Sequence, residues 1–84
     1  MSKALLIITL GNRLHSAIKF QQIVTEFGCI IRTRIGLHHE VGSSCSNQGV
    51  IVLELTGDKS RQKALAKKVS SLAGTKSKLI AIPL

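Results

Sequence analysis

Residues 30–55 read IIRTRIGLHHEVGSSCSNQGVIVLEL, two strand-like runs joined by a loop that carries histidine, cysteine and acidic side chains. In the first run, IIRTRIGL, apolar or β-branched residues alternate with arginines, which predicts a strand with one buried and one basic face. The second run, VIVLEL, predicts a neighbouring strand, and a hairpin is the simplest connection. Glu54 would then pair across the strands with Arg32 or Arg34. The residues expected on the buried faces are Ile31, Thr33, Ile35 and Leu37 in the first run and Ile51, Leu53 and Leu55 in the second.

The segment before this hairpin predicts a strand followed by a helix. Residues 4–10 are mostly apolar, and Gly11-Asn12 ends that run with a residue that caps helices well. Residues 13–27 then place apolar side chains on a broad helical face and polar ones on a solvated stripe. Gly28 is a natural stop for that helix.

The segment after the hairpin predicts a second helix and a last strand. Gly57 and Asp58 end the preceding strand and offer a helix cap, and an apolar stripe follows at helical spacing. Gly74 closes the helix, and residues 78–84 form the last strand, with Pro83 near its end. The stripe consists of Leu65, Ala66, Val69, Leu72 and Ala73.

The resulting order, βαββαβ, predicts an α+β fold of the ferredoxin-like type, a four-stranded antiparallel sheet with two helices on one face. The 84 residues suffice for a single domain of this kind, spanning 1–84. The opposite sheet face is expected to be bare and too apolar for open water, which predicts a homo-oligomer or another partner at the sheet face or strand edges. The residues expected on the bare face are Leu6, Ile8, Val50, Val52, Ile80 and Ile82, or their alternates along the strands.

The composition bears on three properties of the protein: membrane insertion, disulfide content and the charge of its partners. No uncharged apolar run approaches the ~20 residues that a membrane-spanning helix needs. Cys29 and Cys45 are too far apart in sequence to indicate a disulfide framework, so a reducing cytoplasm is expected, with Cys29 as a small core residue. The 12 basic residues against 4 acidic ones give a net charge of +8, which favours polyanions or anionic metabolites as partners.

Three segments carry a resemblance to a known family: Arg34-Ile35-Gly36, residues 49–57, and the helix-to-strand stretch 65–78. In them the chain resembles the ACT-like domains and, more narrowly, the family of iron-only hydrogenase system regulators. The resemblance implies a homo-oligomeric regulatory or small-ligand-binding domain without enzymatic activity, and the hydrogenase in the family's name is a matter of context rather than chemistry. The loop with His38, His39 and Cys45 departs from the family's pattern.

The turn between the first strand and the first helix is the first candidate site for a small anionic ligand. In ACT-like domains the corresponding turn approaches amino-acid effectors, and the exposed amides of a helix N-terminus favour a carboxylate. Gly11 and Asn12 would form the turn, and Arg13 would supply the counter-charge. The alternative is that these residues are a turn and a cap and nothing more.

Two alternative functions come from other parts of the chain. His38, His39 and Cys45 offer imidazole and thiolate donors, so a metal-responsive domain like a nickel regulator is conceivable, against a solvated loop as the plainer interpretation. Seven basic residues fall within 59–78, which suggests a nucleic-acid-binding module. However, the chain has no Tyr or Trp to stack bases on the sheet, so a solvated basic helix is favoured. No arrangement of Ser, His and acid indicates an enzyme.

Overall fold

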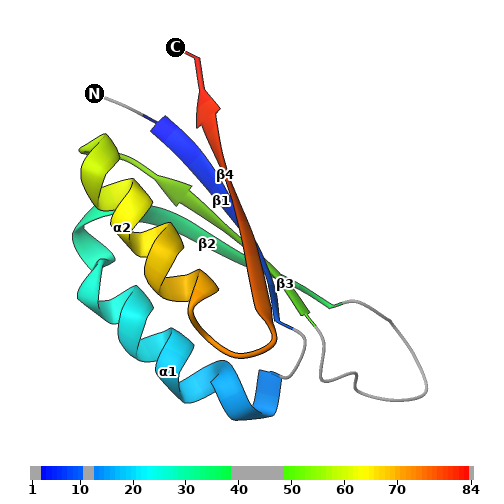
Figure 1. The fold of residues 1–84 in the computed structure, drawn as a ribbon. Helices are drawn as coiled ribbons and strands as arrows, with labels where there is room; N and C mark the ends of the chain where they lie inside the picture. The colour runs from blue at the N-terminus through cyan, green and yellow to red at the C-terminus, as the bar shows by residue number, and fades with distance from the viewer. Residues whose placement is uncertain (1–2, 11–12, 39–48, 84) are drawn as a thin grey trace.

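The computed structural model describes residues 3–10, 13–38 and 49–83, with the side chains of residues 13–17, 37 and 38 outside that description. Its element order confirms the predicted α+β fold of the ferredoxin-like type (Figure 1). The elements are β1 (Lys3–Leu10), α1 (Arg13–Glu26), a short 3₁₀ helix (Gly28–Ile30), β2 (Ile31–His38), β3 (Gly49–Leu55), α2 (Lys59–Ser70) and β4 (Thr75–Ile82).

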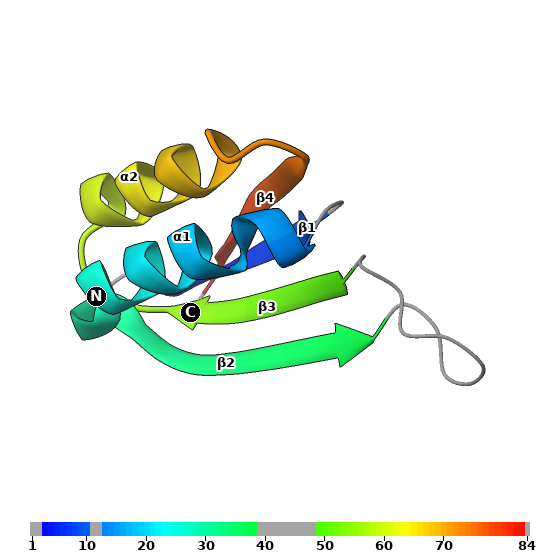
Figure 2. The same ribbon diagram turned by 90° about the horizontal axis from the view of Figure 1, so that it is seen from below.

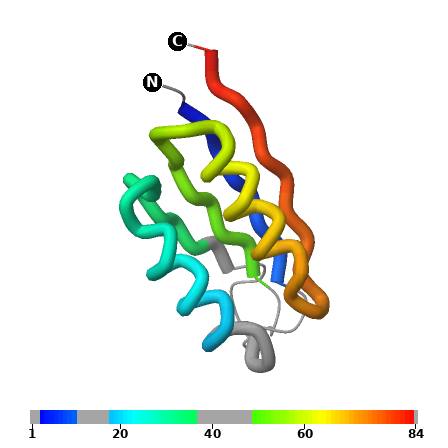
Figure 3. The backbone as a smooth tube through the Cα atoms, turned by 60° about the vertical axis from the view of Figure 1, so that its left-hand side comes forward, coloured from blue at the N-terminus to red at the C-terminus, as the bar shows by residue number. Residues whose placement is uncertain are grey.

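The four strands form one sheet in the order β2-β3-β1-β4, and all three neighbouring pairs are antiparallel. Both helices cover the same face of this sheet, and the other face is left open (Figure 2). The helices lie side by side in front of the strands (Figure 3), and the Lys68 ammonium of α2 lies 2.9 Å from a Glu26 carboxylate oxygen of α1. The arrangement is therefore the predicted two-layer sandwich with one bare sheet face. Within the described residues, no helix is long and apolar enough to cross a bilayer.

The core lies between the helices and the sheet. Along β1 the pattern of burial selects Leu6 and Ile8, both with 0% of their surface exposed, as core residues. This corrects their expected place on the bare face, where the alternates Leu5 and Ile7 lie instead. The prediction had left both sets open, because this strand is apolar on both sides and its own sequence does not say which side the helices cover. The remaining core residues are Ala4, Leu10, Phe20, Val24, Phe27, Ile30, Ile51, Leu53, Leu55, Leu65 and Val69.

A β-bulge in β2 reverses the two faces predicted for that strand. Ile31 lies opposite Leu55, but Thr33 lies opposite the next residue of β3, so Arg32 is the extra residue of the bulge. From Thr33 onward the side chains are shifted by one place relative to simple alternation. Ile35 is consequently 50% exposed on the open face.

Arg34, expected on a solvated basic face, lies on the helix side of the sheet as a consequence of that bulge. Its guanidinium carbon is 5.3 Å from the centre of the Phe20 ring, and its Nη1 donates a 2.6 Å hydrogen bond to the Gln21 side-chain oxygen. The guanidinium group therefore lies over a buried ring while it keeps a polar partner.

The ends of α2 follow the predicted signals in part. Asp58 caps the helix as predicted, because its carboxylate accepts a 3.3 Å hydrogen bond from the Ser60 amide. The helix ends at Ser70, however, and not at Gly74. Gly74, with φ of 74°, instead makes the turn into β4, which starts at Thr75, three residues before the predicted start. A positive φ of this size suits glycine and few other residues.

Candidate functional site

The open face of the sheet is the candidate site, and its centre is a cross-strand row of apolar side chains. Ile35 of β2, Val52 of β3 and Ile7 of β1 are direct neighbours in this row, which Lys78 of β4 completes at the sheet edge. Val52 and Ile7 are partly exposed, and Ile35 is half exposed. Apolar side chains at three adjacent positions across strands form a continuous patch rather than scattered surface residues.

A second row extends this patch toward the chain ends. Thr33 lies opposite Glu54, Glu54 opposite Leu5, and Leu5 opposite Ile80. The predicted placement of Val50, Val52, Ile80 and Ile82 on this face is confirmed by their registers and by the alternating burial of β3. We call this surface the open face; its apolar residues are Leu5, Ile7, Ile35, Val50, Val52, Ile80 and Ile82.

Glu54 is the acidic group of the open face, and its partner differs from the predicted one. The Lys3 ammonium, rather than Arg32 or Arg34, lies 2.9 Å from its carboxylate, and the Thr33 hydroxyl donates a 2.8 Å hydrogen bond to it. These contacts lower the pKa of Glu54 below its usual value. The largest cause is the hydrogen bond from Lys3, followed by the hydrogen bond from Thr33, the charge of Lys3 and, last, the charge of Arg32. Lys3 and Glu54 therefore neutralise each other on the open face, and Lys76 and Lys78 of β4 add positive charge at its edge.

Replacing Glu54 with glutamine is expected to flatten the loss of stability in acid. A carboxylate whose pKa is lowered by folding stabilises the native state above its unfolded-state pKa of about 4.3, and this contribution disappears as pH falls through the lowered folded-state pKa. We expect the free energy of unfolding, measured in urea at pH 7 and pH 3, to fall less in Glu54→Gln than in the unmodified chain.

The variant Lys3→Met should change the same pH dependence in the same direction, because Lys3 makes the largest contribution to the lowered pKa. A Glu54→Gln protein that loses as much stability in acid as the unmodified chain would contradict this assignment.

A second surface with an exposed apolar residue lies on the outer side of α1. Ile18 is 73% exposed there, beside a shallow hollow of about 400 Å³ that it forms with Gln21, Gln22 and Thr25. A single isoleucine among polar side chains is an ordinary surface feature. The open face, with its neighbouring apolar rows, is the stronger candidate.

The structure does not test the ligand and metal sites predicted from the sequence. Four of the predicted residues lie outside the described residues: Gly11, Asn12, His39 and Cys45. Arg13 is the first residue of α1 and His38 the last of β2, and the side chains of both are beyond the description. Within the described residues, no group of three or more His, Cys, Asp or Glu side chains could hold a metal ion. Both site predictions therefore stay predictions.

Cys29 is exposed, which corrects its predicted place in the core. It belongs to the one-turn 3₁₀ helix Gly28–Ile30, in which Ile30 is the residue that turns inward and is buried. The sequence did not reveal this turn. The prediction assumed that the chain passes directly from the helix into the strand after Gly28, and the short 3₁₀ helix changes which of the residues between them is buried.

Two basic residues of the helix predicted to be solvated, Arg61 and Lys68, are exposed and also contact the ring of Phe27. The Arg61 guanidinium carbon lies 4.9 Å, and the Lys68 ammonium 5.8 Å, from the centre of the Phe27 ring. Such cation–π contacts stabilise by about 0.5–1 kcal/mol at exposed sites. Phe20 and Phe27 are both buried on the helix side, so they offer no stacking surface on the open face for bases.

Comparison with known proteins supports the fold. No protein-family model and no curated protein matches the chain. Among solved structures, an uncharacterized protein from Thermotoga maritima is similar over 96% of both chains, with 21% sequence identity and a TM-score of 0.82. An amidase of the hydantoinase/carbamoylase family from Burkholderia phymatum matches with 13% identity and a TM-score of 0.48, over 99% of this chain and 28% of that one. At 21% identity, the similarity to the Thermotoga maritima protein shows that the two chains share a fold.

Proposed function

We propose that this chain is a non-enzymatic regulatory domain that acts as a homodimer, with the two open faces packed against each other. The observation that carries the proposal is the pair of cross-strand rows on the open face, in which Val52 lies between Ile35 and Ile7. A domain of this length buries only roughly 60–65% of its unfolded surface on its own. Covering the open face would add apolar burial that the single chain lacks.

The size of the face suits a second copy. Four strands about 4.8 Å apart, with seven or eight residues each at about 3.3 Å per residue, give a footprint of roughly 500 Å². Two copies would together cover roughly 1,000 Å², the size at which specific interfaces begin.

The charges on the face are compatible with two-fold symmetry. Lys76 and Lys78 lie on β4, at one edge of the sheet. A two-fold axis that runs along the strands places β4 of each copy over β2 of its partner, so the two lysine pairs lie at opposite ends of the interface and do not face each other. Lys3 and Glu54 neutralise each other within one chain.

The regulatory role is inferred from the resemblance of residues 34–36, 49–57 and 65–78 to ACT-like domains and iron-only hydrogenase system regulators. In this proposal the domain is cytoplasmic, and an anionic effector binds near Gly11, Asn12 and Arg13. The shared ferredoxin-like architecture supports the resemblance at the level of the fold.

Sedimentation velocity of the unmodified chain tests the proposal. One chain has a mass of 9.0 kDa, so a dimer has twice 9.0, or 18.0 kDa. We expect the dimer to dominate at micromolar concentration. A monomer that persists throughout that concentration range would contradict the proposal.

A further inference from the structure

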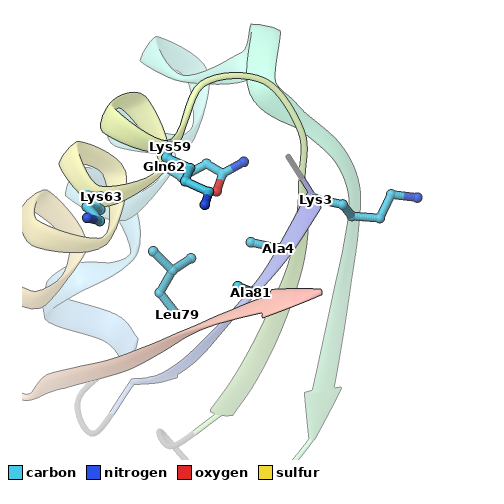
Figure 4. A pocket seen from close by; sticks show the side chains of 7 residues that line it. All are labelled: Lys3, Ala4, Lys59, Gln62, Lys63, Leu79 and Ala81. Carbon is cyan, nitrogen blue, oxygen red and sulfur yellow. The ribbon is translucent and has the colours of Figure 1, made fainter. Parts of the chain in front are cut away.

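A cavity of about 270 Å³ lies between the first turns of α2 and the ends of β1 and β4. It exists because two small side chains, Ala4 and Ala81, are direct cross-strand partners below the helix. Neither is long enough to fill the space under α2, and Leu79 of β4 provides the rest of the apolar floor (Figure 4).

The wall on the helix side of this cavity is polar and cationic. Lys59 and Lys63, four residues apart and therefore one above the other on α2, both line it. Between them is Gln62, whose side chain is buried with 3% of its surface exposed and places its amide group at the cavity (Figure 4).

Neither lysine of the wall has an acidic partner among the described residues. The ion pairs found there join Lys3 to Glu54 and Lys68 to Glu26. Asp58, the nearest acidic residue in the sequence, accepts hydrogen bonds from the amide and hydroxyl of Ser60 as the helix cap.

Lys3 also borders the cavity, but its side chain points away from it (Figure 4). Its ammonium lies 2.9 Å from Glu54, on the open face of the sheet. The positive charge available to a bound molecule therefore comes from Lys59 and Lys63, above an apolar floor.

We propose that this cavity binds a small organic anion with an apolar body, such as a short aliphatic carboxylate. The carboxylate would lie between the ammonium groups of Lys59 and Lys63, and the alkyl chain would lie on Ala4, Leu79 and Ala81. The volume equals that of about nine water molecules at roughly 30 Å³ each, which suits a molecule of that size. The charge-assisted contacts would set its orientation.

The cavity is on the helix side of the sheet, opposite the open face. Binding there is therefore independent of the proposed dimer, and either proposal can fail without the other.

Titration of the ¹⁵N-labelled full chain with hexanoate, followed by amide NMR shifts, tests this site. We expect saturable shifts at the amides of Lys59, Gln62, Lys63, Leu79 and Ala81. Hexanamide, which has the same length and no charge, should bind at least about threefold more weakly, because it loses the attraction to both ammonium groups.

A matched pair of variants separates this site from general attraction to a basic protein. Lys63→Gln should weaken hexanoate binding about threefold to tenfold. Lys67→Gln removes the same charge one turn further along α2, outside the cavity lining, and should leave the affinity within about twofold. Ala81→Leu should abolish saturation by filling the floor, and its unchanged spectrum elsewhere would show that it folds.

Three results would overturn the proposal. The first is a hexanoate titration without saturation, and the second is equal binding of hexanamide. The third is an equal loss in Lys63→Gln and Lys67→Gln, which would mean that the anion responds to net charge alone.

Discussion

Replacing Val52 with aspartate is expected to convert the dimer into a folded monomer. Val52 lies at the centre of the open face, between Ile35 and Ile7, and alternates away from the buried residues Ile51 and Leu53. In the dimer the new carboxylate would be removed from water in an apolar interface, which costs several kcal/mol for each ion. Each 1.4 kcal/mol changes the affinity tenfold, so the dissociation constant should rise at least about a hundredfold.

Sedimentation velocity of Val52→Asp measures this change, and Ile18→Asp is its matched control. Ile18, with 73% of its surface exposed, is more exposed than Ile35, the other exposed large apolar residue among those the structure describes, and it lies on α1, on the helix side. Ile18→Asp should remain a dimer. If the Ile18→Asp dimer dissociates while the Val52→Asp dimer does not, the interface is on α1 and not on the open face. If Val52→Asp unfolds, the two faces of β3 have been assigned incorrectly.

Leu6→Ala is expected to have the largest effect on stability. Leu6 is fully buried on the helix side of the central strand β1. Truncating a buried leucine to alanine costs about 2–5 kcal/mol, because apolar contacts are lost and a cavity remains. That loss is a large share of the 5–15 kcal/mol typical of a folded domain. Urea unfolding in the background of the Val52→Asp monomer measures it without a contribution from the dimer.

Ile7→Ala in the same background is the matched control, because Ile7 is the next residue along β1 and lies on the open face. In the monomer this side chain is partly exposed, so its truncation should cost about 1 kcal/mol. In the unmodified chain, by contrast, Ile7→Ala should weaken the dimer. Equal losses for the two variants in the monomer would contradict the assignment of the faces.

Local signals were sufficient to predict the element order. Asp58 and Gly74 mark real changes of direction, and the alternation in β3 correctly separates Ile51 from Val52. These features act over a few residues, so the sequence contains them directly. From six elements in this order, the ferredoxin-like topology follows.

The faces of β1 and β2 could not be predicted in the same way. In β1, Leu5, Leu6, Ile7 and Ile8 are all apolar, so pairing with the neighbouring strands decides which of them are buried. In β2, the bulge at Arg32 moves every later side chain to the opposite face. A bulge depends on how the partner strand aligns, and the alternation of residues 30–37 gave no sign of it.

The open face was predictable as a bare apolar surface, whereas the cavity was not. The first follows from counting two helices over a four-stranded sheet. The second depends on Ala4 and Ala81 being paired although they lie at opposite ends of the chain. Lys59 and Lys63 appeared in the sequence only as members of a basic helix.

Intermolecular NOEs between methyl groups would test the central claim most directly. In an equimolar mixture of ¹³C-labelled and unlabelled chains, isotope-filtered spectra detect contacts between copies only. The dimer proposed here predicts intermolecular NOEs from the methyl groups of Val52, Ile7 and Ile35 and none from Leu6. A mixture without intermolecular NOEs, or with NOEs from Ile18 in place of Val52, would contradict it.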